Sequence, residues 1–169
     1  MGNSINFGSL QISQLAAVLL TGLVAGLFYG YQCSVIRGLG ELNTEVYLSS
    51  FQSINKVIQN PVFFLSFMGN LVVLPIACWL CYKQSSLINF YLILAATLLY
   101  YFGVFGVTVA GNVPLNNQLN EFLINGSSQN EMEGMRSLFE KPWNRYHSIR
   151  TVLSIVSFCL ATLSLFRFK

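Results

Sequence analysis

Four long apolar stretches, separated by polar segments, dominate the pattern of this chain. They cover about residues 13–37, 61–82, 86–110 and 143–167. Each is long enough for a membrane-spanning helix, which needs roughly 20 mostly apolar residues. Because proline suits the first turn of a helix, the fourth helix is expected to begin near Pro142. The pattern predicts an all-α integral membrane protein, a four-helix bundle that forms one transmembrane domain over residues 1–169.

The polar segments after the first and third stretches are predicted to contain short amphipathic helices. In the first loop, four apolar residues recur near helical spacing among polar ones: Val46, Phe51, Ile54 and Ile58. In the third loop, Asn116 or Asn117 is a candidate cap of one short helix, and residues 131–139 are expected to form another. The turn at Lys83 is short, so the second and third spans form an antiparallel hairpin. The first and third loops therefore lie on one side, where we expect them to pack together.

The first span carries a strip of glycines. Gly22, Gly26 and Gly30 stand four residues apart, so one side of that helix has no side chains and is predicted to pack closely against a neighbouring helix.

Composition supports the membrane assignment and excludes some functions. The chain is 54% hydrophobic and 9% charged, with a mean hydropathy of +0.58, whereas charged residues make up about 25% of soluble domains. The net charge of +3 is too small and too dispersed to indicate nucleic-acid binding. The expected partners are membrane lipid and a lipophilic small molecule; an oligomer is left open.

The charges in the sequence give only a weak indication of the orientation in the membrane. Six of the nine Lys and Arg residues lie on the side of the first and third loops, and three lie on the side of the termini. Three of those six, Arg37, Arg145 and Arg150, are candidates for function, and without them the two sides carry equal numbers. All six acidic residues lie on the loop side. The count of Lys and Arg alone favours the loop side in the cytoplasm, whereas the net charge favours the termini there. We expect both termini in the cytoplasm and the protein in a plasma or inner membrane.

The most informative pattern opens the fourth span. Trp143, His147 and Arg150 stand at helical spacing on one face. The face continues through small and polar residues where lipid contact would favour large apolar ones, so it points inward: Ser154, Ser157, Ala161 and Ser164. An ionisable residue at membrane depth is by default a functional candidate. The alternatives are that Arg150 snorkels or pairs with Glu41 or Glu45, and that Trp143 is an interfacial anchor.

The ends of the first and third spans converge on the same side. The first brings Tyr29, Tyr31 and Arg37, and the third brings Asn112 and Asn116. A polar cluster from three helices above an aromatic bundle predicts a pocket for a flat, lipophilic ligand that carries a few oxygens.

Four segments together resemble the anthrone oxygenase-like family of small four-span membrane proteins. They are GLFYGYQCSVIRGL, NPVF, NVPLNNQL and WNRYHSIRT, and the resemblance covers nearly the whole chain. Named members of that family oxidise anthrones to anthraquinones, so the resemblance implies a membrane-embedded oxygenase acting on an anthrone-, hydroquinone- or quinone-like molecule.

An anthrone carbanion passes an electron to dioxygen without a cofactor, so the protein must supply a base and a group that holds the oxyanion. An unperturbed imidazole, with a pKa of about 6.5, suits His147 to the first role, and Arg150 or Arg37 suits the second. The expected ligand contacts are Trp143, Tyr29, Tyr31, Phe51, Asn112 and Asn116.

The sequence leaves other functions open. The polar cluster is also compatible with a non-catalytic protein that binds lipid or a partner. Cys78 and Cys81 form a CxxC motif, but Cys33 lies at the opposite face and Cys159 lies inside the fourth span, so no thiol network closes. No metal or cofactor is predicted, although Glu41 and Glu45 with His147, or a haem on the single histidine, are left open.

Overall fold

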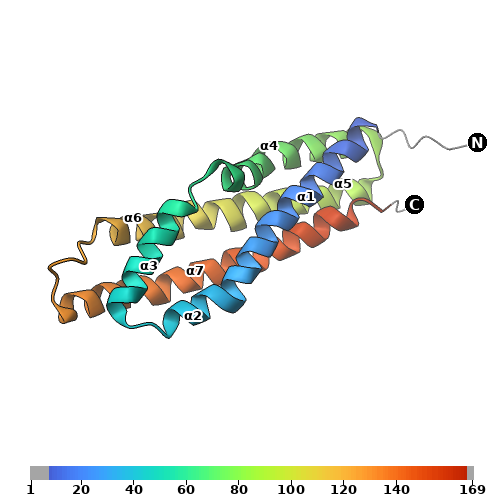
Figure 1. Ribbon diagram of the computed structural model, residues 1–169. Coiled ribbons are helices and arrows are strands. Elements are labelled where there is room, and N and C mark those ends of the chain that lie inside the picture. The colour runs from blue at the N-terminus through green and yellow to red at the C-terminus, as the bar shows by residue number, and fades with distance from the viewer. Residues whose placement is uncertain (1–7, 167–169) are drawn as a thin grey trace, which may run out of the picture.

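The computed structural model describes residues 8–166. The predicted end of the fourth span at residue 167 and the basic residues Arg167 and Lys169 lie outside this range. Within it the ordered elements are all helical, with no strand (Figure 1). Four continuous helices are long and apolar enough to cross a membrane: Ser9–Gly40, Pro61–Gln84, Leu87–Glu121 and Gln129–Leu163. The prediction of an all-α membrane bundle with four spans is confirmed.

Two of these long helices change their winding along their length. The first is built from α1 (Ser9–Gly30), the π-helical segment η1 (Tyr31–Val35) and α2 (Ile36–Gly40). The third is built from α5 (Leu87–Leu98), the π-helical segments η2 (Leu99–Gly106) and η3 (Thr108–Asn112), and α6 (Val113–Glu121). The remaining helices are α3 (Thr44–Val57), α4 (Pro61–Gln84) and α7 (Gln129–Leu163). Segments of π-helix are rare and are frequent at functional sites.

Side-chain caps fix where most of these helices begin. The Asn43 side chain accepts a hydrogen bond from the Val46 amide at the start of α3. Asn60 caps α4 in the same way, with Pro61 in the first turn. Each cap satisfies an amide that has no partner inside the helix.

The fourth helix begins well before the predicted position. The Ser128 and Glu131 side chains form a capping box at its start, and α7 then runs through Pro142 without a break. The prediction that this helix starts near Pro142 is therefore wrong. A proline inside a helix removes one hydrogen bond, but the helix continues here because its first turns are stabilised by the capping box and by packing against the first loop.

The two short helices expected in the third loop are parts of longer ones. Residues 131–139 belong to α7, and α6 follows η3 directly, so neither Asn116 nor Asn117 is a cap. The amphipathic helix expected in the first loop is α3.

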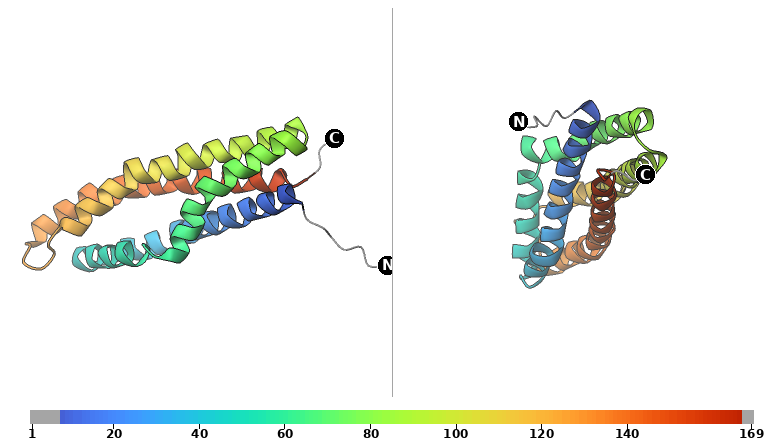
Figure 2. Two further views of the ribbon diagram at one scale, coloured as in Figure 1. Left: turned by 90° about the horizontal axis from the view of Figure 1, so that it is seen from above. Right: turned by 90° about the vertical axis from the view of Figure 1, so that its right-hand side faces the viewer.

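The long helices lie side by side in an elongated bundle (Figures 1 and 2). The α4–α5 turn, the start of α1 and the end of α7 lie at one end, and α3 lies with the α6–α7 connection at the other. The Gln52 amide on α3 donates to the Leu119 and Phe122 carbonyls, at 2.8 and 2.9 Å. We call the assembly of α3, α6 and the first turns of α7 the cap. Its core is apolar: Leu39, Tyr47, Leu48, Phe51, Leu119, Met132, Phe139 and Trp143.

The glycine strip of the first helix packs only in part. A Cβ on Gly22 would lie 3.0 Å from the Phe158 ring, but a Cβ on Gly26 or Gly30 would meet nothing within 4 Å. The predicted packing face is therefore limited to Gly22. A closer approach occurs at Gly111, where a Cβ would lie 2.6 Å from the Tyr146 ring.

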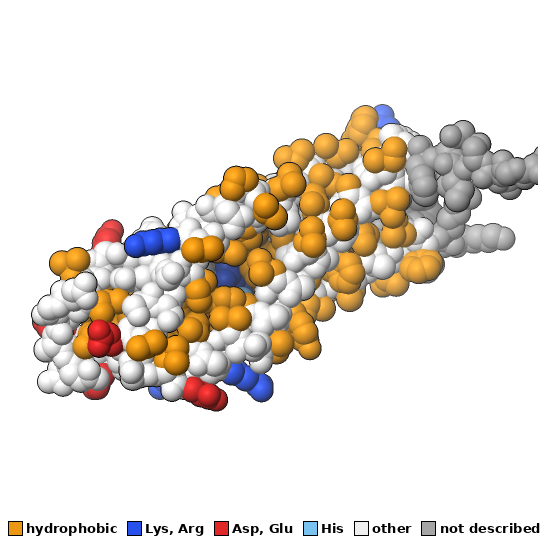
Figure 3. All heavy atoms as spheres, in the orientation of Figure 1, with side chains coloured by type: hydrophobic (Ala, Val, Ile, Leu, Met, Phe, Trp, Pro, Cys, Tyr) orange, Lys and Arg blue, Asp and Glu red, His pale blue; other side chains and the backbone are white. Residues whose placement is uncertain are grey.

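The surface separates into two zones. Hydrophobic side chains cover the part of the bundle nearest the α4–α5 end, whereas acidic side chains gather around the cap (Figure 3). This distribution matches a bundle surrounded by lipid with its cap at the membrane surface.

Candidate functional site

A cavity of about 310 Å³ lies where the bundle meets the cap. Its walls come from all four long helices and from α3. Ring and aliphatic side chains form most of the lining, and the polar members are few: Tyr31, Asn55, Gln59, Thr108, Asn116, Asn117, His147 and Arg150. Its rim includes exposed apolar residues of α1, α4 and η3, such as Leu27, Met68 and Val109. A cavity of this kind, mostly apolar with a few convergent polar groups, is typical of small-molecule sites.

His147 lies at the centre of the cavity wall and is 1% exposed. Its ring stacks on Trp143, with centroids 5.0 Å apart and planes 10° apart. The Nδ1 atom receives hydrogen bonds from Arg150 Nε and Nη2, at 3.2 and 3.0 Å. Because a guanidinium only donates, Nδ1 must be the acceptor. The Nε2 atom lies 3.2 Å from the Phe28 carbonyl oxygen and therefore carries the proton. The imidazole is thus neutral and held in one tautomer.

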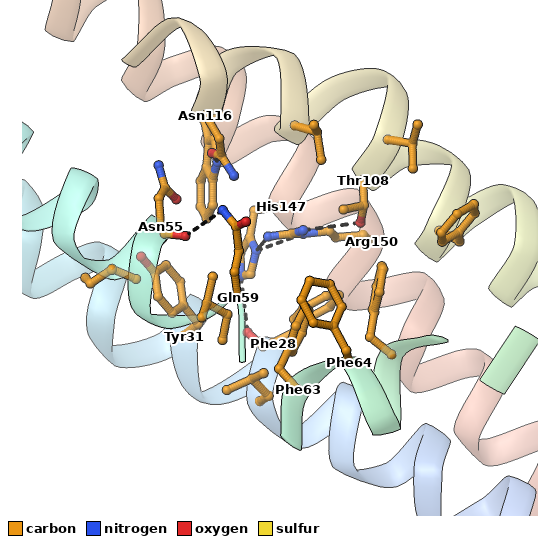
Figure 4. A pocket seen from close by; sticks show the side chains of 18 of the residues that line it. Phe28, Tyr31, Asn55, Gln59, Phe63, Phe64, Thr108, Asn116, His147 and Arg150 are labelled. Carbon is orange, nitrogen blue, oxygen red and sulfur yellow. Dashed lines mark hydrogen bonds between the residues drawn. The ribbon is translucent and has the colours of Figure 1, made fainter. Parts of the chain in front are cut away.

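The Phe28 carbonyl lies in the last turn of α1, just before η1 begins at Tyr31. It accepts a hydrogen bond from the Tyr31 amide, and a carbonyl oxygen has a second lone pair. That second lone pair accepts from the His147 ring. The bond reaches across from α1 to α7 (Figure 4).

Arg150 is buried beside the histidine and is 8% exposed. Its Nη1 donates to the Thr108 hydroxyl at 3.2 Å. The guanidinium carbon lies 4.4 Å from the centroid of the Phe28 ring, a cation–π contact. Across residues 8–166, the only ion pair is Arg136 with Glu140. The pairing of Arg150 with Glu41 or Glu45 is therefore absent from the described chain, and this buried cation is balanced by neutral groups and rings alone.

Two asparagines orient the tryptophan. The Trp143 indole Nε1 donates to Asn116 Oδ1 at 2.6 Å, and Asn112 Nδ2 donates to the Trp143 carbonyl at 3.2 Å. Asn112 is fully buried and lies behind the cavity wall, whereas Asn116 lines the cavity. The structure thus brings the motif after the third span onto the motif that opens the fourth, but only Asn116 reaches the ligand space.

One side of the cavity is rich in neutral polar groups. Tyr31, Asn55, Gln59 and Asn116 lie there, on the other side of His147 from Thr108 (Figure 4). We call this set the amide end. In the part of the chain that the structure describes, the Tyr31 hydroxyl and the Asn55 Nδ2 are buried and have no hydrogen-bond partner.

Four of the predicted site residues lie outside the cavity: Asn112, described above, and Tyr29, Arg37 and Phe51. Tyr29 is 60% exposed, and Arg37 is exposed as well, so neither lines the ligand space. Phe51 is buried in the cap, where its ring packs edge-on against Trp143 at 4.9 Å and supports it from behind. The helix face that points inward at this level carries Phe28 and Tyr31.

The sequence prediction missed most of the aromatic lining. Phe28, Phe63, Phe64, Phe67 and Phe105 form the apolar part of the cavity. Thr108, Asn55 and Gln59 were missed as well. The inward position of Asn55 could have been predicted, because this residue continues the buried stripe of α3 that Tyr47, Leu48 and Phe51 begin. No comparable signal marked Thr108, whose position depends on the π-helical winding of η3.

The thiols and the metal candidates do not form a site. Cys78 and Cys81 are free thiols in α4, and Cys81 accepts a hydrogen bond from Gln14. Glu41 and Glu45 are exposed, away from the buried His147. Within the described range, no three His, Cys, Asp or Glu side chains are close enough to hold a metal ion.

The fold and the cavity define the class of protein: a small integral membrane protein of four long helices with an aromatic site between them. Residues 63–160 match the family model described as anthrone oxygenase, which covers more than half of the chain. The chain therefore belongs to the anthrone oxygenase family and is a membrane oxygenase-like protein. The match includes His147 and Arg150 but not α1 or α3. No curated protein and no solved structure matches the chain.

Proposed function

We propose that this protein is a cofactor-independent oxygenase that converts a lipophilic anthrone-like substrate to the corresponding quinone. The observation that carries this proposal is the buried pair of His147 and Arg150, which lines an aromatic cavity and has no carboxylate partner in the described chain. A buried cation without a counter-ion is costly. A substrate that becomes an anion in this cavity would supply the missing charge.

The cavity suits a flat molecule of three fused rings. Its volume of about 310 Å³ lies at the lower end of the roughly 300 to 1,000 Å³ of ligand pockets. The phenylalanine side chains Phe63, Phe64 and Phe67 offer ring faces and edges to an aromatic ligand. The exposed apolar rim gives such a ligand a route in from the bilayer.

His147 is the proposed base. In the resting structure the Nδ1 lone pair is occupied by Arg150, and the Nε2 proton is held by the Phe28 carbonyl. A proton from the acidic carbon of the substrate must therefore go to Nδ1, after Arg150 has turned away. The Phe28 carbonyl keeps the ring oriented and stabilises the imidazolium that forms.

Arg150 is the proposed stabiliser of the enolate oxygen. As negative charge develops on the ketone oxygen, the guanidinium moves its Nε and Nη2 donors from His147 to that oxygen. Thr108 continues to hold Nη1. The same movement frees the base and binds the oxyanion, so the two events are coupled. A donor placed where charge develops in a site without water is the most effective form of electrostatic catalysis.

The oxygen step needs no further reactant. The carbanion gives an electron to dioxygen, the two radicals combine, and a carbon–oxygen bond forms. When the second hydrogen leaves that carbon, the oxygen–oxygen bond breaks. One oxygen atom becomes the new carbonyl and the other leaves as water, so one dioxygen is consumed for each quinone formed.

The test is oxygen uptake by the full chain, purified in detergent or lipid nanodiscs, with an anthrone as substrate. Quinone formation is followed by absorption, and samples without protein correct for spontaneous oxidation. The proposal requires uptake that scales with protein and matches quinone one to one. Uptake equal to the background would refute it, and mass spectrometry and metal analysis of the same sample would then show whether a lipid, quinone, haem or metal has been bound instead.

We also propose that the cap lies outside the cytoplasm, with both termini inside it and the protein in a plasma or inner membrane. The acidic side chains around the cap support this orientation. Protease cleavage of a tag fused to either terminus, in sealed vesicles of known orientation, tests it; cleavage from the outer face of intact cells would reverse the assignment.

A further inference from the structure

The amide end carries polar atoms that the proposed reaction does not use. The Asn55 side chain is 4% exposed and its Nδ2 has no partner among the described residues, and the same is true of the buried Tyr31 hydroxyl. Both residues line the cavity that His147 and Arg150 line. A buried polar group without a partner costs about 1–3 kcal/mol, so two of them on residues that line one ligand space point to a polar group on the ligand.

The other amide side chain of α3, that of Gln52, has a structural role. Gln52 uses its amide on the Leu119 and Phe122 carbonyls and so joins α3 to α6. Asn55 lies one turn further along and makes no such contact with its Nδ2. Instead it ends the apolar stripe of α3 at the cavity. A leucine there would extend the stripe without any unpaired group, so an amide at this position needs another explanation.

The chemistry of this end selects a neutral oxygen. Its polar lining consists of amides and one phenol, and the single cationic side chain among the cavity-lining residues is Arg150. Amide and phenol groups donate and accept hydrogen bonds. A hydroxyl or carbonyl on an aromatic ring fits this pattern, whereas a carboxylate or phosphate would be left without a cation there.

The position of the amide end separates it from the oxygen that Arg150 holds. Asn55 and Tyr31 lie on one side of His147, and Thr108 lies on the other (Figure 4). Building on the proposed function, we infer that Asn55 and Tyr31 bind a second oxygen of the substrate, a ring hydroxyl remote from the reacting ketone. The protein would then select hydroxylated polycyclic substrates over unsubstituted ones.

The experiment compares two ligands on the full chain in nanodiscs. Anthraquinone and a hydroxylated anthraquinone are titrated, and quenching of tryptophan fluorescence or equilibrium dialysis gives Kd. We expect the hydroxylated compound to bind about tenfold more tightly, because two neutral hydrogen bonds contribute on the order of 1 kcal/mol or more. Asn55→Leu and Tyr31→Phe should each reduce this preference and leave the affinity for anthraquinone unchanged.

Tyr47→Phe is the matched control. The Tyr47 hydroxyl is also buried without a partner, but it lies in the cap core and does not line the cavity. Burial, reinforced by the nearby Glu140, raises the pKa of this phenol, so it stays a neutral hydroxyl. The control should keep the full preference for the hydroxylated ligand.

The outcomes separate the inference from the proposed function. Equal binding of both ligands by the unmodified protein, or an equal effect of Tyr31→Phe and Tyr47→Phe, would overturn the inference alone and mean that water satisfies these groups. Failure of both ligands to bind would overturn the proposed function and this inference together. A preference that disappears in both cavity variants and persists in the control would establish it.

Discussion

Two buried polar clusters lie in this bundle, one at each end, and they differ in how completely they are paired. At the α4–α5 end, Gln14 and Asn89 both donate to the Ser164 carbonyl at 2.7 Å, and Asn89 also donates to the Phe166 carbonyl. These bonds satisfy the free carbonyls at the end of α7. The cluster contains no charged side chain, and neither amide is left with an unpaired buried atom in the described structure.

The cluster around His147 and Arg150 differs from the first cluster in both charge and pairing. It contains a buried guanidinium, it lines a cavity, and the adjacent amide end has two unpaired buried atoms. The first cluster stabilises the fold and leaves nothing for a ligand to satisfy. The second contains buried groups that have no partner within the described residues. These two clusters therefore differ in pairing as well as in charge.

The largest effect is expected at His147. His147→Gln preserves a donor for the Phe28 carbonyl and an acceptor for Arg150 but cannot take up a proton. Loss of a general base typically costs about 10²- to 10⁴-fold, so the oxygen uptake rate with an anthrone should fall by that factor. Circular dichroism and size-exclusion profiles should match the unmodified protein. Unchanged uptake in a folded variant would remove His147 as the base.

Arg150→Met should lower the rate somewhat less, because loss of one oxyanion donor costs about 10²- to 10³-fold. The same change should leave the melting temperature unchanged or raise it, since it removes a desolvated cation that has no carboxylate partner. Thermal melting of the detergent-solubilised protein measures this. A clear loss of stability together with unchanged activity would mean that Arg150 stabilises the fold and that its cluster is a structural one.

At the other end the expectation is reversed. Gln14→Leu removes the donor to Ser164 and should lower the free energy of unfolding by about 1 kcal/mol. The rate per folded molecule should stay within twofold, because Gln14 lies at the far end of the bundle from the cavity. If the activity of the folded fraction fell as steeply as in Arg150→Met, the two ends would be functionally coupled and the division drawn above would be wrong.

The smallest effect is expected at Cys78. This half-buried thiol packs against the bundle core and lies outside the cavity, so Cys78→Ala should change volume only and leave the oxygen uptake rate unchanged. A thiol-based redox mechanism would instead require a strong loss in this variant, and treatment of the unmodified protein with a thiol-blocking reagent would reproduce that loss.

The membrane spans and the inward face of the fourth helix could be predicted because each depends on local pattern. Apolar length specifies a span, and helical spacing places Trp143, His147 and Arg150 on one face wherever the helix begins. That is why the wrong start at Pro142 did not disturb the face. The correct start was also readable, because Ser128 and Glu131 have the spacing of a capping box.

The partners of that face could not be predicted in the same way. Which residues of the first helix meet His147 depends on which face of that helix is buried. Tyr31 continues the buried stripe that runs to Phe28, and Tyr29 lies off it. Because apolar residues surround this helix on all sides, its sequence does not mark that stripe. The contribution of Asn55 depends on how α3 docks on α6 and α7, a long-range contact that the local pattern of α3 does not encode.

The uninterrupted course of α7 sets the depth of the site. At 1.5 Å per residue, the stretch from Arg150 to Leu163 rises about 20 Å. With the Leu163 end at one face of a hydrocarbon layer roughly 30 Å thick, Arg150 lies within the layer, about 10 Å from the cap side. Dioxygen and polycyclic aromatic molecules both dissolve better in hydrocarbon than in water. The bilayer would therefore concentrate both reactants at the level of His147. Part of the reaction rate would then result from the depth in the membrane at which α7 places this residue.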